Sequence, residues 1–181
     1  MTGNTVSNRA KVGGFNNIYF KRREELGLTR DKASELLEAI PPERIEKIEN
    51  ERCEPHPEEV LLMAEKYKAP ELCNYYCSNQ CPIGQVYVPE IKIQDLSQIV
   101  IKMLSSLNAV QDNQRKFIDI VADGKIADDE LEKFIDIQEE LEKISVIVQT
   151  LQLWSEQMLA DGEINAELYE SIKSKRNKTN P

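Results

Sequence analysis

A regular spacing of apolar residues in the second half of the chain restricts its possible folds more than any other feature. Between residues 96 and 121, apolar positions recur at alternating steps of four and three, and the pattern returns between residues 134 and 158. This heptad-like spacing places the apolar side chains along one side of an α-helix. The first stripe comprises Leu96, Val100, Met103, Leu107, Val110, Phe117 and Val121, with Gln114 filling one slot. The second comprises Phe134, Ile137, Leu141, Ile144, Val148, Leu151, Trp154 and Met158.

Two long helices with such stripes are expected to pack against each other. The sequence Asp123-Gly124 interrupts the pattern and provides a turn between them. The second helix would be roughly 50 Å long at about 1.5 Å per residue, and alone it would leave its stripe in water. An antiparallel hairpin that buries both stripes is therefore predicted over residues 93–175, with a short last helix from Asn165 to Lys175. The hairpin is also expected to pair with a second copy as a coiled-coil homodimer, and residues 176–181 to form a basic tail.

Composition extends the helical prediction to the whole chain. Only seven of the 181 residues are glycine, and Glu, Lys, Leu and Ile dominate, so helix is favoured over strand and the fold is expected to be all-α. No run of about 18 apolar residues is present, so neither a transmembrane helix nor a membrane partner is expected. Residues 1–15 are polar, lack the apolar core of a signal peptide and are predicted to form a flexible arm, which favours a cytoplasmic location.

Charge is distributed unevenly along the chain. The net charge is −9, and residues 91–172 carry 17 acidic but only 7 basic side chains. The predicted hairpin is thus strongly acidic, and it offers a surface to a protein partner. Residues 1–90 carry 12 basic and 15 acidic side chains, so any contact of this half with nucleic acid would require a local basic patch.

Capping signals divide the first half into short helices. Gly27 can end one helix with a positive φ, and the hydroxyl of Thr29 can cap the next. That next helix is predicted to run from Arg30 to Leu37. Its inward-facing residues are predicted to be Ala33, Leu36 and Leu37.

A third short helix is predicted from Pro42 to Asn50. Proline suits the first position of a helix, where no backbone N–H is needed. Ile45 and Ile48 are three residues apart and are expected to anchor the helix in the core.

The segment that follows carries a family resemblance. The run Ile48-Glu49-Asn50-Glu51-Arg52-Cys53-Glu54-Pro55 precedes a helix with the pattern apolar-x-x-apolar-Ala over Glu58–Tyr67, and Gly27-Leu28-Thr29 precedes the second helix. In this order and spacing, residues 16–79 resemble the Cro/repressor-type (XRE) helix-turn-helix family. The family usually has glycine where this chain has Glu51.

The resemblance implies a lambda-repressor-like helix-turn-helix bundle over residues 16–81 and a sequence-specific DNA-binding transcriptional regulator. In this family the third helix enters the major groove of double-stranded DNA. Carried over by position, Arg44 would pair with guanine, whereas Lys47 or Arg52 would contact phosphate, and Glu49 would bond within the domain. The implied DNA-binding set is Arg30, Lys32, Glu43, Arg44, Lys47, Asn50 and Arg52, with Glu46 on the same outward side.

No pattern in the sequence points to an enzyme. The chain has no glycine-rich phosphate loop and no Gly-x-Ser-x-Gly motif. Its single histidine, His56, stands between Pro55 and Pro57 without an obvious catalytic partner. The alternative to DNA binding is therefore a protein–protein adaptor that uses a repurposed helix-turn-helix and the acidic hairpin.

Three cysteines recur at four-residue steps near the end of the first half. Cys73 and Cys77 would lie one turn apart on a helix, and Cys81 follows just beyond it. With a fourth ligand such as Cys53 or His56, three thiolates could hold zinc or an iron–sulfur cluster. A thiol redox sensor and a set of small buried apolar side chains remain alternatives. Residues 82–92, which contain two prolines, are predicted to be an extended linker.

Overall fold

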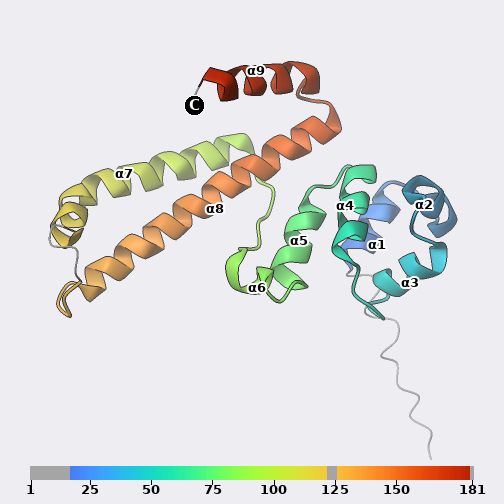
Figure 1. Ribbon diagram of the computed structural model, residues 1–181, viewed down its shortest axis with the longest axis horizontal. Helices are drawn as coiled ribbons and strands as arrows, with labels where there is room; N and C mark the ends of the chain where they lie inside the picture. The colour runs from blue at the N-terminus through green and yellow to red at the C-terminus, as the bar shows by residue number, and fades with distance from the viewer. Residues whose placement is uncertain (1–16, 122–125, 180–181) are drawn as a thin grey trace, which may run out of the picture. The chain divides into compact units, whose positions relative to one another are not determined.

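The computed structural model describes residues 17–121 and 126–179, which are helical with no strand among them (Figure 1). The fold is therefore all-α, as the composition predicts. None of the helices in this part of the chain combines the length and apolar character needed to cross a membrane. The helices are α1 (Ile18–Glu25), α2 (Arg30–Leu37), α3 (Pro42–Glu49), α4 (Pro57–Lys66), α5 (Glu71–Asn79), α6 (Gly84–Tyr87), α7 (Leu96–Val121), α8 (Leu131–Asp161) and α9 (Ala166–Thr179).

The chain divides into two compact units. Residues 1–90 and 159–181 belong to the first unit, and residues 91–158 form the second. The sequence instead groups residues 93–175 as one region. Helix α9 also continues to Thr179, so the beginning of the predicted basic tail is helical.

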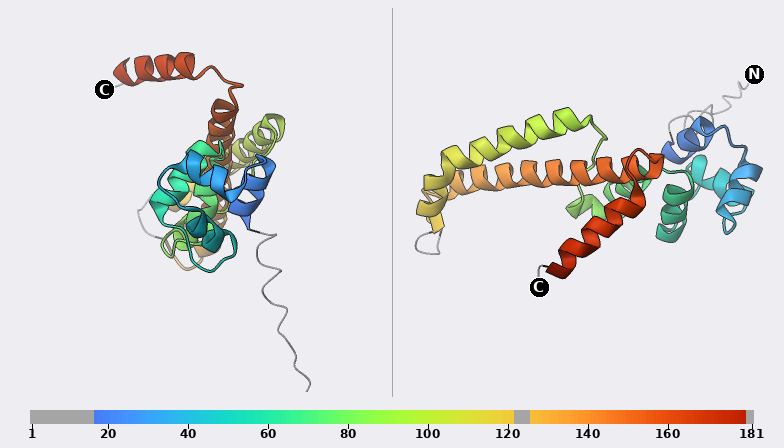
Figure 2. Two further views of the ribbon diagram at one scale, coloured as in Figure 1. Left: turned by 90° about the vertical axis from the view of Figure 1, so that its right-hand side faces the viewer. Right: turned by 90° about the horizontal axis from the view of Figure 1, so that it is seen from above.

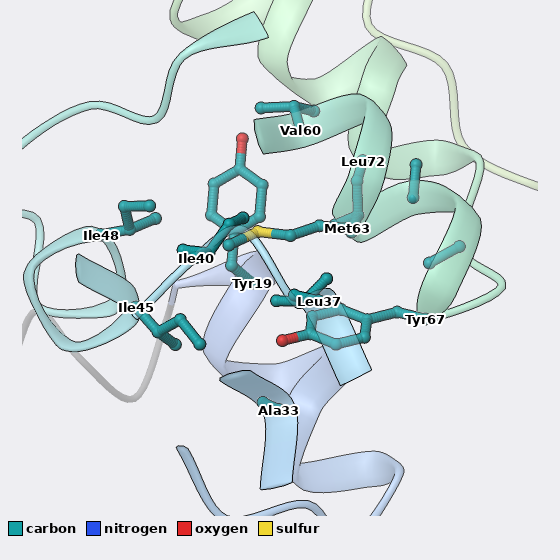
Figure 3. Packing of buried hydrophobic residues seen from close by; sticks show 12 residues of the cluster. Tyr19, Ala33, Leu37, Ile40, Ile45, Ile48, Val60, Met63, Tyr67 and Leu72 are labelled. Atoms are coloured by element: carbon teal, nitrogen blue, oxygen red, sulfur yellow. The ribbon is translucent and has the colours of Figure 1, made fainter. Parts of the chain in front are cut away.

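The core of the first unit is built from helices α1 to α5 and the turns between them (Figure 3). Ala33 and Leu37, four residues apart on α2, are buried, whereas Leu36 is 38% exposed. The inward position predicted for Leu36 is therefore wrong, because about 100° of helical rotation separates it from Leu37. The buried cluster comprises Tyr19, Ala33, Leu37, Ile40, Ile45, Ile48, Val60, Met63, Ala64, Tyr67, Ala69 and Leu72.

Local signals place the ends of α2 and α3 where the sequence predicts them. Gly27 has a φ of 64°. The side chain of Thr29 accepts a hydrogen bond from the backbone N–H of Lys32 at 3.3 Å, which caps α2. Helix α3 begins at Pro42, and its last turn is tied to α1 because the amide of Asn17 donates to the carbonyl of Ile48 at 3.2 Å.

The predicted linker contains a helical turn, α6, so an extended conformation over all of residues 82–92 is wrong. A Cβ added to Gly84 would lie 2.0 Å from the carbonyl oxygen of Cys77, so glycine allows α6 to pack directly on α5. The side chain of Asn74 also donates to the carbonyl of Pro89 at 3.0 Å. The two prolines restrict the backbone at their own positions and leave room for one helical turn between them.

Helices α7 and α8 of the second unit run antiparallel and lie side by side in both views (Figures 1 and 2). The predicted hairpin is therefore confirmed, although its Asp123-Gly124 turn lies outside the described residues. The expectation that the hairpin buries both stripes is wrong in part, because several of their members remain exposed. These are Leu96 (40%), Val100 (43%), Leu107 (50%), Leu141 (54%) and Val148 (42%).

Candidate nucleic-acid interface

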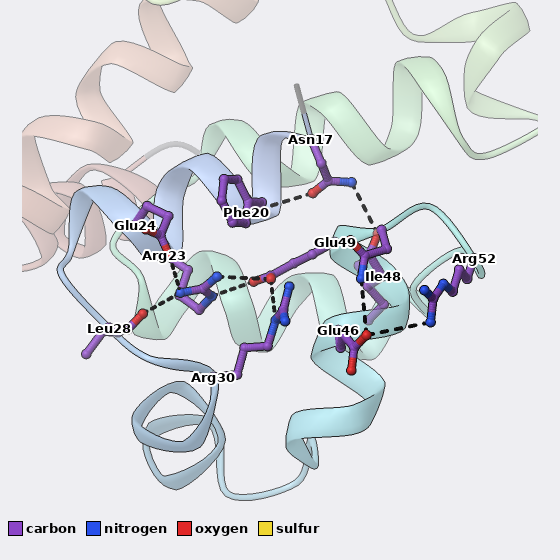
Figure 4. A network of polar contacts seen from close by, with 11 residues as sticks. Asn17, Phe20, Arg23, Glu24, Leu28, Arg30, Glu46, Ile48, Glu49 and Arg52 are labelled. Carbon is purple, nitrogen blue, oxygen red and sulfur yellow. Dashed lines mark hydrogen bonds and ion pairs between the residues drawn. The ribbon is translucent and has the colours of Figure 1, made fainter. Parts of the chain in front are cut away.

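A buried ion-pair network fixes α3 to the first two helices (Figure 4). Glu49 at the end of α3 has a side chain that is 1% exposed, and its Oε1 accepts from Nε of Arg23 at 2.6 Å. Its Oε2 accepts from Nη2 of Arg23 at 3.1 Å and from Nε of Arg30 at 2.9 Å. The predicted bonding of Glu49 within the domain is confirmed, and its carboxylate holds α1, α2 and α3 together.

Arg23 is fully engaged at this centre. Its Nη1 also donates to the carbonyl of Leu28 and to the carboxylate of Glu24. The hydrogen bond to Glu49 raises the pKa of Arg23. Burial, reinforced by the nearby Glu49, raises the pKa of Tyr67 to about 12. Both guanidinium groups of the network therefore have a structural role, and Arg30, predicted to contact DNA, is 35% exposed and bound to Glu49.

Arg44 is turned toward α4 and away from the outward side of α3. Its Nε and Nη2 donate to the two carboxylate oxygens of Glu59 at 2.8 and 2.7 Å. Its Nη1 donates to Sγ of Cys53 at 2.8 Å, and Nη2 also donates to the carbonyl of Glu54 at 3.0 Å. The outward position predicted for Arg44 is therefore wrong, because a bidentate carboxylate partner on α4 captures its guanidinium.

The Arg44–Glu59 pair also alters the titration of its members. Burial alone would raise the pKa of the Glu59 carboxyl, but hydrogen bonds from Arg44 and from the backbone N–H of His56 hold it below its ordinary value. The His56 hydrogen bond is 2.6 Å long and belongs to a capping box at the start of α4. The hydrogen bond to Glu59 raises the pKa of Arg44.

The remaining outward residues form one continuous surface, here called the α3 surface. It consists of Glu43, Glu46, Lys47, Asn50 and Arg52. Glu43 and Lys47 are exposed, and the carboxylate of Glu46 lies 3.6 Å from Nη1 of Arg52 and accepts from Asn50 at 3.4 Å. The first four stand at positions i, i+3, i+4 and i+7 of the chain, so they share one side of the helix. The surface carries two carboxylates and two cations, so its charge is mixed. Lys32, on α2, is also exposed.

The sequence alone does not reveal the Arg44–Glu59 pair. Glu59 stands three residues after His56 and belongs to the capping box at the start of α4. The same carboxylate also binds a side chain 15 positions earlier, and no periodic pattern encodes such a distance. The outward assignment of Lys47 needs no such contact, because helical geometry alone places it opposite the buried Ile45 and Ile48.

The three cysteines do not come together as a metal site. Cys73 and Cys77 lie on α5, and Sγ of Cys81 is 3.5 Å from the backbone nitrogen of Gly84. Each is half-buried and none forms a disulfide. Among the residues that the structure describes, no cluster of three or more Cys, His, Asp or Glu side chains could hold a metal ion. The sulfur of the fourth cysteine, Cys53, accepts a hydrogen bond from Arg44.

Comparisons with known proteins identify no relative of this chain. No family model matches the chain, and no curated protein or solved structure matches it.

Proposed function

We propose that the chain acts in the cytoplasm as a sequence-specific DNA-binding regulator of the XRE type, with α2 and α3 as its helix-turn-helix. One observation carries this proposal. The residues that anchor α3, namely Ile45, Ile48 and Glu49, are all 1% exposed, so its opposite side is left for a ligand. A short helix that packs on the core with one side and is exposed on the other suits insertion into a major groove.

The backbone after α3 also supports the proposal. Glu51 has a φ of 57°, the left-handed conformation that glycine adopts most readily. The N–H of Arg52 then donates to the carbonyl of Lys47 at 2.8 Å and closes the end of the helix. Glycine is the usual residue at this position in the family that residues 16–79 resemble. This chain has Glu51 instead, and Glu51 adopts the left-handed conformation that glycine favours.

The α3 surface offers several of the chemistries that read base edges. Lys47 can donate to guanine O6 and N7, Asn50 can bond bidentately to adenine, and Glu43 can accept from cytosine N4. Lys32 and Arg52 are the cations placed for phosphate contacts. Arg44 takes a positioning role in this arrangement, since it ties the start of α3 to α4.

The electrostatics predict weak non-specific binding. Arg23, Arg30 and Arg44 are bound by carboxylates within the domain and are less exposed than Arg52, so they contribute less to the neutralisation of phosphates. Each phosphate contact contributes a slope of about −0.9 to the dependence of log K on log salt concentration. With Lys32 and Arg52 as the principal contacts, the slope per chain is expected to be shallow, about −2.

The experiment is a selection of bound sequences from random DNA with the full chain at low salt, followed by affinity measurements on the enriched sequence. Lys47→Ala and Asn50→Ala are expected to weaken binding by about 1–3 kcal/mol, because each loses a base contact. Lys66→Ala also removes one positive charge, but on α4 and outside the α3 surface. It is expected to leave the affinity within about twofold. Failure to enrich any sequence would contradict the proposal.

A protein–protein adaptor is the second candidate, and the mixed charge of the α3 surface favours it. Glu43 and Glu46 stand among the cations, where they would repel phosphate but would fit a partner surface of alternating charge. A chain that enriches no DNA, and whose binding to a protein partner is lost in Lys47→Ala, would establish this role instead.

A further inference from the structure

One side of the hairpin carries a row of uncovered apolar residues on α7. The row follows the spacing i, i+4, i+8 and i+11, which keeps its members on one side of a helix. Its members are Leu96, Val100, Leu104 and Leu107, which are 40%, 43%, 56% and 50% exposed. The two helices of the hairpin therefore do not cover this side of α7.

Helix α8 continues the same apolar surface. Leu141 and Val148, two helical turns apart, are 54% and 42% exposed. A small apolar pocket of about 110 Å³ lies between the helices and joins the two rows, with Leu107 on one wall and Ile144 and Val148 on the other. The two rows thus form one surface, here called the apolar face: Leu96, Val100, Leu104, Leu107, Leu141 and Val148.

Several charged residues gather along a groove on the other side of the hairpin. A groove of about 700 Å³ runs between the same two helices and is lined by Lys102, Ser105, Glu139, Glu142 and Lys143, among others. Ser105 follows Leu104 directly, and the rotation of about 100° per residue turns it from the apolar face to this groove. The groove therefore contains charged side chains that the apolar face lacks, although Val146 and Ile147 also line it.

The apolar face approaches the apolar area of a standard protein interface. Full burial of a leucine or valine side chain removes roughly 100 Å² of apolar surface. With its half-buried neighbours Ile137 and Ile144, the face exposes roughly 300–350 Å². A standard interface buries about 800 Å² per partner, of which roughly 450 Å² is apolar. The exposed area is roughly three quarters of that apolar area.

The charge of the hairpin selects among the possible occupants. Residues 91–158 carry 13 acidic and 7 basic side chains, so phosphate groups of DNA or of an anionic membrane would be repelled. A second apolar face suits this surface better, because none of its six members carries a charge at the contact. We propose that two copies of the chain dimerise through their apolar faces and complete an antiparallel four-helix bundle. This inference is independent of DNA binding.

The experiment is sedimentation of the full chain without DNA at about 1–100 µM. The wild type is expected at twice its chain mass of 20.8 kDa. Leu104→Glu and Leu141→Glu each place two carboxylates in the symmetric interface, so each is expected to weaken dimerisation at least about 100-fold. Ser105→Glu introduces the same charge one residue away, in the groove, and it is expected to leave the dimer intact.

Folding is monitored by far-UV circular dichroism on the same samples. Leu104 is more than half exposed, so Leu104→Glu is expected to retain its helix content. Leu104→Asn, which is neutral, repeats the test if the glutamate variant loses helix. A wild-type monomer at every concentration, an assembly larger than a dimer, or equal dissociation of the Leu104→Glu and Ser105→Glu variants would each overturn the proposal. A dimer that binds no DNA would contradict only the proposed function.

Discussion

Glu49 shows how a buried charge at the base of α3 is compensated by partners on other helices. A carboxylate removed from water requires compensation, and Arg23 and Arg30 supply it from two other helices. The hydrogen bonds are directional, so they also fix the rotation of α3 about its own axis. The outward position of Lys47 therefore depends on a residue on the opposite side of the helix.

Glu49→Gln is expected to reduce the free energy of unfolding by about 3–5 kcal/mol, because it leaves the buried Arg23 with only the more exposed carboxylate of Glu24 as a negative partner. Urea unfolding at pH 7 measures the loss. The matched control is Glu46→Gln on the same helix, where the partner Arg52 is 64% exposed and a change below about 1 kcal/mol is expected. Equal losses in the two variants would contradict a structural role specific to Glu49.

The Arg44–Glu59 pair predicts a sensitivity to acid. The folded state holds the pKa of Glu59 below the ordinary value of 4.5, so the pair stabilises the fold above that pH. This contribution is lost as the pH falls from about 4.5 through the lowered pKa of the folded state. The difference in unfolding free energy between the wild type and Glu59→Gln should therefore shrink between pH 6 and pH 3. A difference that stays constant over that range would exclude the ion pair as its source.

The sequence predicts the orientation of a side chain correctly where that orientation depends only on the periodicity of its own helix. The burial of Ile45 and Ile48 and the exposure of Lys47 follow from the periodicity of a single helix. The orientation of Arg44 depends on Glu59, which lies on another helix, and Arg30 depends on Glu49 in the same way. The candidate site was therefore predictable in its position on α3 but not in which cations it leaves available.

Among the helices, α6 depends most directly on one residue. It has four residues, too few for independent stability, and it forms because Gly84 contacts the backbone of α5. Sequence reasoning does not predict this helix, because prolines such as those at positions 82 and 89 are typical of an extended linker. By contrast, the bounds of α2 and the antiparallel pairing of α7 and α8 follow from capping and spacing alone.

Gly84→Ala is expected to detach α6, because the new Cβ would overlap the carbonyl of Cys77. The cost is about 1–3 kcal/mol and should be local. Amide hydrogen exchange at Val88, whose N–H donates to Gly84, is expected to accelerate. Gly27→Ala provides the comparison, since position 27 has a φ of 64° and no neighbour within 4 Å of the new Cβ. It should cost about 1–2 kcal/mol and leave exchange at Val88 unchanged.

At the scale of the whole molecule, the two units differ in how much of their apolar surface they bury. The first unit buries a cluster of core residues from five helices, whereas the second exposes much of its apolar stripe. The sequence predicts the stripes but not the width of surface that each helix leaves uncovered, because two helices can shield only the side on which they meet.

The only tryptophan, Trp154, lies on α8 and reports on the second unit. If the hairpin dimerises, the urea midpoint followed by its fluorescence should rise as protein concentration increases from about 1 to 100 µM, because association stabilises the folded state by mass action. Leu104→Glu should abolish this rise. A wild-type midpoint that is independent of concentration would argue against the dimer.

The division of labour on α3 has an evolutionary consequence. Its fold rests on Ile45, Ile48 and Glu49, while its outward positions contribute little to stability. If α3 reads DNA as proposed, mutations at Glu43 and Lys47 would therefore change the target at small cost to folding.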